Sequence, residues 1–261
     1  MEKQRLFNIE EFDIKLNTEF LATNFVYCNE IDSTNDFLMN NDDYNRHGTV
    51  LLAEFQTNGK GRKRRQWSST RGQNLTFSIL LNKNLKGDRI NHYNFGAALA
   101  LGNAIENLFQ LPVEMKWPND ILIKGKKVAG ILCESASQGD KITKLIIGIG
   151  VNVNQPHFPG KYNLEPTSIR IEFKKEVSRE KLLSEFFNIF ESVIERIEKA
   201  PETILNDWRA KCRMIGEKVR IITDEGEQFG KFEDVDENGY LMLRKGDKIE
   251  KIHYGDITLR R

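Results

Sequence analysis

The chain concentrates positive charge in one short segment that has the composition of an anion-binding site. Five cations occupy six consecutive positions, among glycines and before a tryptophan: Lys60, Arg62, Lys63, Arg64 and Arg65, with Gly59, Gly61 and Trp67. Glycine lets the backbone approach a ligand closely or adopt positive φ, and cations without neighbouring carboxylates attract an anion. Residues 59–65, the basic loop, therefore predict an anion site. The alternative is a solvated basic loop that touches RNA or DNA.

The basic loop lies between two apolar segments, residues 50–55 and 74–81, which are predicted strands. It is thus anchored at both ends. It has neither the GxxxxGK[ST] pattern of a P-loop nor a dinucleotide-binding fingerprint. Phosphate would therefore be bound by side-chain charge and mobile backbone amides. Such a loop could close over a reactive intermediate and exclude water.

Three further motifs carry residues suited to phosphate chemistry. KWPND at residues 116–120 presents a carboxylate, Asp120, beside Lys116, a combination that can hold Mg²⁺ against ATP phosphates. Lys127 opens the apolar run KVAGILCES and can carry its ammonium into a pocket. GIGVNVN at residues 148–154 ends an apolar strand in small residues and amides. The alternatives are, respectively, an ordinary proline turn, a solvated lysine and a packed strand end.

Together these residues suit the attack of a carboxylate on the α-phosphate of ATP. Two anions meet in that reaction, so cations must offset their repulsion and stabilise the charge that builds up in the transition state. The reaction requires no protein nucleophile, in agreement with the lack of a serine or cysteine catalytic signature.

The elements that must position these motifs alternate along the chain. Periodicity and turn signals predict strands at 24–31, 50–55, 74–81, from 115, and at 127–135 and 141–153, the last two as a hairpin. Helices are predicted from a cap at Ser33 or Thr34 through 40, and at 92–109, 178–199 and 202–211, with a loop at 154–167. Short alternating segments follow from 214. We therefore expect an α+β catalytic domain at 1–213 and a small barrel-like β-domain at 214–261.

Composition narrows the class of protein. The net charge of +1 disfavours a protein that coats nucleic acid, and the hydrophobic fraction of 39% is that of a globular protein. Cys28, Cys133 and Cys212 are widely spaced, as expected for a reducing compartment, and the histidines lack metal-ligand spacing. The longest apolar run is too short to cross a membrane, and the N-terminus is too charged for a secretory signal. We expect a soluble cytoplasmic protein.

The sequence resembles the biotin–protein ligase family over almost its whole length. Five motifs occur in the family's order and spacing: IDSTND (31–36), AEFQTNGKGRKRRQW (53–67), KWPNDIL (116–122), KVAGIL (127–132) and GIGVNVN (148–154). The resemblance implies a mixed or antiparallel central sheet with flanking helices, of the class II synthetase type, and a C-terminal SH3-like β-barrel. It also implies that biotin and ATP give biotinyl-5′-AMP and pyrophosphate. A lysine of a biotin carboxyl carrier protein then accepts the biotinyl group.

The resemblance also implies roles for individual residues. Ser33, Thr34 and Asn35 lie near the biotin pocket, and Gln56 contacts its edge. Arg62, Lys116 and Lys127 are catalytic, with Lys127 holding the carboxylate and Asp120 the Mg²⁺. The remaining biotin- and nucleotide-binding residues are Gly59, Lys60, Gly61, Arg65, Trp67, Asn119, Gly130, Gly150 and Asn152. Trp67 packs either under the loop or near the nucleotide.

Two positions depart from the family's loop pattern, which is close to GRGRxGRxW. Lys60 replaces an arginine and loses its bidentate fork, and Arg64 replaces a flexible glycine. Only 32 residues precede Ser33, too few for the helix-turn-helix domain of some members, so we predict no DNA-binding repression. The alternatives are a lipoate–protein ligase, a nucleic-acid-binding module and a catalytically silent biotin binder. A homodimer through an exposed sheet edge stays open.

Overall fold

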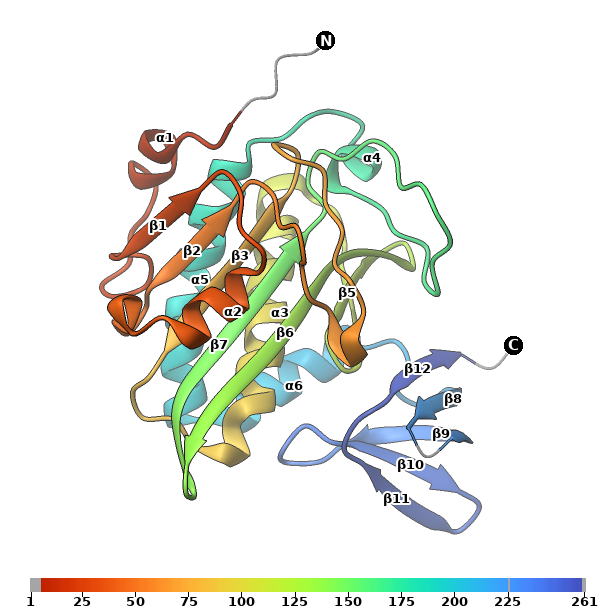
Figure 1. Ribbon diagram of the computed structural model, residues 1–261. Helices are drawn as coiled ribbons and strands as arrows, with labels where there is room; N and C mark the ends of the chain where they lie inside the picture. Colours follow the sequence, from red (N-terminus) through yellow and green to blue (C-terminus); the bar gives the residue numbers. More distant parts are fainter. Residues whose placement is uncertain (1–5, 225, 260–261) are drawn as a thin grey trace.

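The computed structural model describes residues 6–224 and 226–259, apart from the side chain of Arg64. Its centre is a seven-stranded mixed sheet in which β1 and β2 are parallel and the other neighbours antiparallel (Figure 1). The strand order is β1 (Phe25–Cys28), β2 (Val50–Ala53), β3 (Leu75–Leu81), β7 (Lys141–Val151), β6 (Lys126–Gln138), β5 (Asp120–Ile123) and β4 (Glu114–Lys116). The predicted α+β fold with a mixed central sheet is confirmed.

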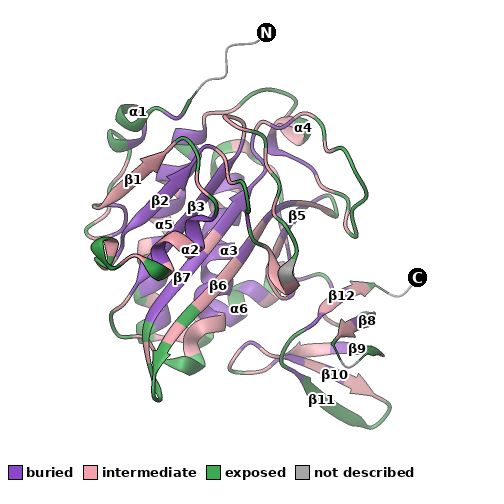
Figure 2. Ribbon diagram, viewed as in Figure 1, coloured by how far each residue is buried: buried purple, intermediate pink, exposed green. Residues whose placement is uncertain are grey.

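Long helices cover one face of the sheet. They are α3 (Ile90–Phe109), α5 (Arg179–Lys199) and α6 (Pro201–Lys211), which lie close to the predicted ranges. Side chains alternate along a strand, so successive residues of β7 enter different cores. Ile147 joins the large core beneath these helices, whereas Ile146 joins a small second cluster on the opposite face. Figure 2 shows that the central strands of this sheet are largely buried.

The opposite face carries the short helix α2 (Thr34–Asn40) (Figure 1). Its Leu38 packs with Leu51, Leu80 and Ile146 in the second cluster. Sequence periodicity did not predict the remaining short helices, which are α1 (Ile9–Asp13), α4 (Ile169–Phe173) and the 3₁₀ turns η1 (Asp42–Tyr44), η2 (Arg62–Arg64) and η3 (Gly87–Arg89). Because α2 covers only part of its face, the ends of β6 and β7 are left to line a cavity.

The C-terminal strands form a separate five-stranded antiparallel sheet. Its order is β11 (Lys248–Ile252), β10 (Leu241–Lys245), β9 (Gly226–Val235), β8 (Lys218–Thr223) and β12 (Asp256–Leu259). Alternate residues such as Val219, Ile221 and Phe232 are buried, as expected for strands with one covered face. The prediction of a small all-β unit is confirmed. None of the described helices has the length and apolar character needed to span a membrane.

The turn between β9 and β10 joins this sheet to the helical layer. The Trp117 indole donates a hydrogen bond to the Gly239 carbonyl (3.2 Å), and the side-chain amide of Asn91 donates one to the Asn238 carbonyl (2.8 Å). Gly239 has φ +79°, and a Cβ there would lie 2.8 Å from the Phe95 ring. The turn thus requires glycine for both conformation and space. This contact holds β8 and β12 beside the mouth of the cavity.

Candidate active site

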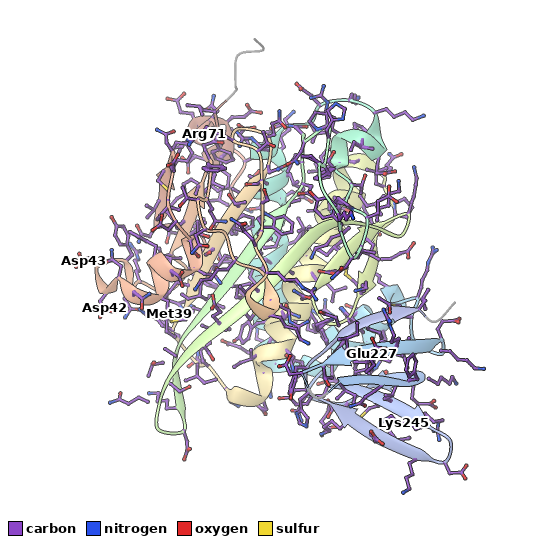
Figure 3. All side chains as sticks on the ribbon, turned by 45° about the vertical axis from the view of Figure 1, so that its right-hand side comes forward. Met39, Asp42, Asp43, Arg71, Glu227 and Lys245 are labelled. Carbon is purple, nitrogen blue, oxygen red and sulfur yellow. The ribbon has the colours of Figure 1, made fainter. Side chains whose placement is uncertain are left out.

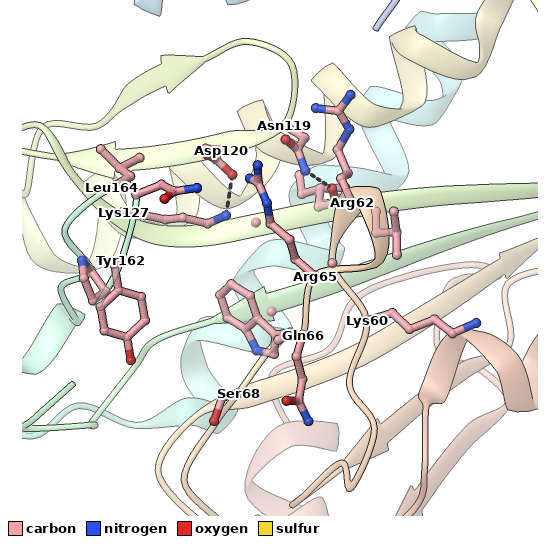
Figure 4. Close-up of a pocket in the computed structure, with 18 of the residues that line it drawn as sticks. Lys60, Arg62, Arg65, Gln66, Ser68, Asn119, Asp120, Lys127, Tyr162 and Leu164 are labelled. Atoms are coloured by element: carbon pink, nitrogen blue, oxygen red, sulfur yellow. Dashed lines mark hydrogen bonds and ion pairs between the residues drawn. The ribbon is translucent and has the colours of Figure 1, made fainter. Parts of the chain in front are cut away.

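A cavity of about 670 Å³ lies between the central sheet and the C-terminal sheet. Its walls come from α2, the basic loop, β6 and β7, residues 158–166, β8 and β12. Figure 4 shows Arg62 of the basic loop, Lys127 of β6 and Tyr162 around this space. Every predicted site residue except Gly59 lines it: Ser33, Thr34, Asn35, Gln56, Lys60, Gly61, Arg62, Arg65, Trp67, Lys116, Asn119, Asp120, Lys127, Gly130, Gly150 and Asn152. The fold therefore gathers the five motifs around one space, while the role of each residue stays a prediction.

Gly59 lies at the base of the basic loop, where it packs against the Trp67 backbone. It is buried beside the cavity, its carbonyl accepts a hydrogen bond from the Trp67 amide (2.8 Å), and a Cβ there would lie 2.5 Å from the Trp67 carbonyl oxygen. Glycine is thus needed for the close approach of two backbone segments at the base of the loop. The predicted contact of Gly59 with ligand stays a prediction.

The first turn of α2 forms one end of the cavity. Ser33 caps the helix by accepting a hydrogen bond from the Asp36 amide (3.3 Å). Gln56 Oε1 accepts from both the amide (2.7 Å) and the hydroxyl (3.0 Å) of Thr34. The buried Ser78 hydroxyl lies 2.5 Å from Asn35 Oδ1 and 2.7 Å from Thr34 Oγ1. The side chains of Thr34, Asn35 and Gln56 are uncharged and held by hydrogen bonds, which suits the polar edge of a small organic ligand.

Glycines of the paired strands β6 and β7 form the floor. Gly130 is opposite Gly150 in the ladder. A Cβ at Gly150 would lie 2.2 Å from the Trp67 ring, and one at Gly148 would lie 2.1 Å from Asn35 Oδ1. The glycines thus make room for a tryptophan and an amide on the sheet surface. The Trp67 ring packs on Gly150 and also lines the cavity, so a contact between Trp67 and the nucleotide stays a prediction.

Charged groups cluster at the other end, around Asp120. Lys116 ends β4 and pairs in register with Asp120 at the start of β5, which places its Nζ 3.6 Å from Asp120 Oδ2. Lys127 Nζ lies 2.5 Å from Asp120 Oδ1 (Figure 4). Burial lowers the pKa of Lys116, while Asp120 opposes that shift. Asn119 is fixed by a hydrogen bond from its amide to the Ile131 carbonyl (2.6 Å).

The basic loop is folded and docked on the C-terminal sheet. The Arg62 guanidinium donates to the Gly255 carbonyl (3.2 Å) and lies 3.8 Å from Asp256, which also pairs with Arg65. Lys63 donates to the Ile222 carbonyl (3.1 Å) and has φ +53°. Burial lowers the pKa of Arg62 from its ordinary value, with Asp256 opposing the shift. The cations at the cavity are thus offset by carboxylates in this state.

The two departures from the loop pattern have different outcomes. Lys60 pairs with Asp36 at the first turn of α2, so the lysine keeps a definite partner without an arginine fork. The left-handed backbone conformation occurs at Lys63, one residue before the position where the family has glycine. The side chain of Arg64 lies outside the described part of the chain, and its expected effect on loop stiffness stays a prediction.

Sequence reasoning missed two groups of cavity residues. One lies on the C-terminal strands, as Arg220, Ile222, Asp256, Ile257 and Thr258. The other lies in the segment predicted only as a loop, as Phe158, Lys161, Tyr162, Asn163, Leu164 and Pro166. No spacing in the sequence indicates the first group. For the second, two aromatic residues and a lysine in a proline-rich loop are a usable signal, because such loops often carry binding residues.

The likeness to known proteins covers both sheets. The model of the Biotin/lipoate A/B protein ligase family matches residues 27–152, and that of the Biotin protein ligase C terminal domain matches residues 214–260. The chain is 32% identical over 257 residues to the bifunctional ligase/repressor BirA of Bacillus subtilis, covering 95% of this chain and 78% of that protein. It is 34% identical to the biotin–[acetyl-CoA-carboxylase] ligase of Paracoccus denitrificans, over 74% of this chain and 83% of that protein.

A solved structure shares the fold at a similar level of identity. The biotin protein ligase from Aquifex aeolicus in complex with biotin and ATP superimposes with a TM-score of 0.78 and 32% identity, over 92% of this chain and 99% of that chain. The two family models, the relatives and the solved structure thus agree. The chain belongs to the biotin–protein ligase family.

Proposed function

We propose that this protein uses ATP to convert biotin to biotinyl-5′-AMP and then transfers the biotinyl group to a lysine of a carrier protein. The observation that carries the proposal is one cavity with a neutral, hydrogen-bonded end at Thr34 and Gln56 and a cationic end at Lys116 and Lys127. Its volume of about 670 Å³ lies in the usual range for small-molecule sites. The Aquifex relative was solved with biotin and ATP.

In the first step, a biotin carboxylate oxygen attacks the α-phosphorus of ATP. An O–P bond forms, the bond to the β-phosphate oxygen breaks, and pyrophosphate leaves with the electron pair. Lys127 and Arg62 offset the repulsion between the two anions and stabilise the charge on the phosphoryl oxygens. Lys127 is paired with Asp120 and Arg62 with Asp256, and we expect the substrate anions to replace these pairings.

In the second step, the acceptor lysine amine attacks the acyl carbon and displaces AMP. The C–N bond forms as the C–O bond to the phosphate breaks, and the amine loses a proton. The basic loop and residues 158–166 line the same cavity and can exclude water from the acyl-adenylate. Loss of the intermediate to hydrolysis is thereby limited.

Magnesium is part of this proposal, and the cavity residues fit an ion that is held jointly by one carboxylate and the ATP phosphates. Among the described residues there is no group of three or more His, Cys, Asp or Glu side chains that could hold a metal. Mg²⁺ commonly uses one or two protein carboxylates together with substrate phosphates. Asp120 would therefore hold an ion that arrives with ATP. When bound, Mg²⁺ would neutralise phosphate charge.

The partners and the division of the chain are likewise proposed. We infer that the acceptor is a biotin carboxyl carrier protein, because a relative at 34% identity is named for acetyl-CoA carboxylase. A catalytic domain at 1–213 and a β-domain at 214–261 are supported by the separate C-terminal sheet. A cytoplasmic location is supported by three free thiols, at Cys28, Cys133 and Cys212.

Two predictions concern association. The sheet edges at β1 and β4 are the places where a homodimer could form, and sedimentation at several concentrations tests it. The expected lack of DNA-binding repression stays a prediction, which titration with an operator duplex at physiological salt tests. Specific binding there would contradict it.

The rival functions receive less support. A polynucleotide would need the basic loop exposed, yet Arg62, Lys63 and Arg65 contact the chain's own C-terminal sheet. A lipoate ligase is disfavoured by the match to the biotin protein ligase C-terminal domain. A catalytically silent biotin binder remains the alternative that only an assay separates.

The test is ATP–pyrophosphate exchange with biotin, with lipoate and without acid, followed by transfer to a purified carrier domain. We expect exchange with biotin alone and label on the carrier lysine. Exchange that requires lipoate would assign the rival substrate. Biotin binding without exchange would identify a silent binder.

A further inference from the structure

Lys144 is a buried cation that the proposed chemistry does not use. It lies on β7, its side chain is only 9% exposed, and it does not line the cavity. Its Nζ donates to the carbonyl oxygens of Met39 (3.1 Å) and Leu38 (3.4 Å) and to Asp42 Oδ1 (3.2 Å). An ammonium has three donors, and here each one has an acceptor. Burial of this charge is therefore compensated by contacts to one short segment, residues 38–42.

That segment contains the C-terminal end of α2. A helix leaves its last carbonyl groups without partners inside the helix and carries partial negative charge there. Leu38 and Met39 are in the last turn, and Asp42 opens the next turn, η1. Figure 3 shows Met39 and Asp42 near each other at the far end of this helix. Lys144 thus supplies both hydrogen bonds and a positive charge where α2 needs them.

Helix α2 depends on such external contacts. It has seven residues, far fewer than a helix needs to be stable alone in water. Leu38 is its one side chain in the core of the second cluster, with Phe37 and Met39 only packed against that cluster. Lys144 reaches α2 from β7, the strand that also carries Gly148 and Gly150 of the cavity floor. It therefore fixes the helix relative to that floor.

The other end of α2 meets the cavity. Thr34 bonds to Gln56, and the Asn35 amide donates to Glu134 of β6 (2.7 Å) while Asn35 Oδ1 accepts from Ser78. Asn35 sits where Gly148 leaves it space, with 2.1 Å between Oδ1 and the position of a Cβ. Because Thr34 and Asn35 are in the first turn of α2 and line the cavity, a shift of α2 displaces both side chains within the cavity.

We propose that Lys144 is a positioning residue for the biotin end of the site, acting through α2. The inference rests on the proposed function, which assigns that end to biotin. Lys144 is remote from the cationic cluster at Lys116, Asp120 and Lys127, none of which it contacts among the described interactions. Its loss should therefore weaken biotin binding and leave ATP binding unchanged.

The test compares Lys144→Met, which keeps the length and apolar stem, with Lys144→Arg, which keeps the charge. Lys141→Met, at an exposed position of the same strand, is the matched control. Biotin affinity is measured by calorimetry, and the KM values for biotin and ATP by pyrophosphate exchange. For Lys144→Met we expect biotin Kd and KM to rise about tenfold, as for the loss of a charged hydrogen bond. ATP KM should stay unchanged, and Lys144→Arg should restore most of the affinity.

Wild-type biotin KM in folded Lys144→Met would overturn the inference, as would an equal rise in both KM values. Methionine at position 144 cannot donate to the carbonyl groups of Leu38 and Met39. Lys144→Gln is therefore measured in parallel, because its side-chain amide can still donate. Here too, a wild-type biotin KM or an equal rise in both KM values would overturn the inference. Hydrogen exchange of the α2 amides separates this inference from the proposed function. If the wild-type protein lacks biotin-dependent ATP–pyrophosphate exchange, the proposed function is wrong. Faster hydrogen exchange of the α2 amides in Lys144→Met would still support the role of Lys144 in holding α2, and unchanged hydrogen exchange would refute that role.

Discussion

Replacement of Lys127 by alanine should slow biotin-dependent ATP–pyrophosphate exchange by about a hundred- to a thousandfold. Lys127 lines the cavity at its cationic end, with Nζ 2.5 Å from Asp120 Oδ1 and 5.6 Å from the centre of the Trp67 ring. A donor placed where charge develops in a water-poor site typically contributes about 3–4 kcal/mol to the transition state. At about 1.4 kcal/mol per factor of ten, that contribution gives the stated loss.

The same substitution should leave the protein folded. Lys127 and Asp120 retain 26% and 13% side-chain exposure, so the pair is partly screened by water. After removal of Lys127, Asp120 still has Lys116, 3.6 Å away. We therefore expect the free energy of unfolding to fall by about 1–2 kcal/mol at most. The rate should change much more than the stability.

The neighbouring Lys126 provides the control. It is a lysine of the same strand, does not line the cavity, and pairs at the surface with Glu165 (2.6 Å). Lys126→Ala should keep exchange within about twofold of wild type, since exposed pairs contribute little. The assay measures kcat and both KM values for each variant, with urea unfolding in parallel. If Lys127→Ala exchanges pyrophosphate within about threefold of wild type, the assignment of Lys127 to the reacting groups is wrong.

Two further predictions concern the cavity floor and acid stability. Gly150→Ala places a Cβ 2.2–2.6 Å from the Trp67 indole, so the ring must move. We expect altered tryptophan fluorescence and an increase in substrate KM of about tenfold, with Gly87→Ala, whose Cβ has only one contact at 3.8 Å, as the unaffected control. Burial alone would raise the pKa of Glu54, but its bonds to Arg179 lower that pKa on balance. The ionised Glu54 therefore contributes its full stabilisation above the ordinary pKa near 4.5. This stabilisation is lost as the pH falls through the pKa of Glu54 in the folded protein. Unfolding free energy measured from pH 7 to 3 should decline less in Glu54→Gln than in wild type, and an identical decline would contradict this linkage.

Much of the fold follows from local pattern. The apolar runs at 74–81 and 141–153 predicted central strands, and helical periodicity predicted α3, α5 and α6 close to their ends. These elements are long and strongly periodic, so local rules suffice. The short helices α1 and α4, of five residues each, were missed because their formation depends on tertiary packing more than on propensity.

The sequence by itself determined the chemical inventory of the site. Cations, glycines, an Asp beside a Lys, and strand-terminal amides each follow a predicted strand, so their convergence could be expected. Only the tertiary structure decided their pairing. Arg62 bonds to Gly255, 193 positions away, and Asp120 lies between two lysines. Such contacts depend on how the two sheets dock and on which strands become neighbours. Neither can be read from the spacing of residues in the sequence.

The basic loop shows the difference most clearly. Its charge was evident in the sequence, whereas its docking on Asp256 and the packing of Trp67 on Gly150 were not. Charge is a property of residue type, but the partner of a charge is fixed by the shape of the whole chain, and so is the space that a missing Cβ leaves. The sequence therefore determined which charged groups are available to the site, and the fold decided which carboxylates they pair with.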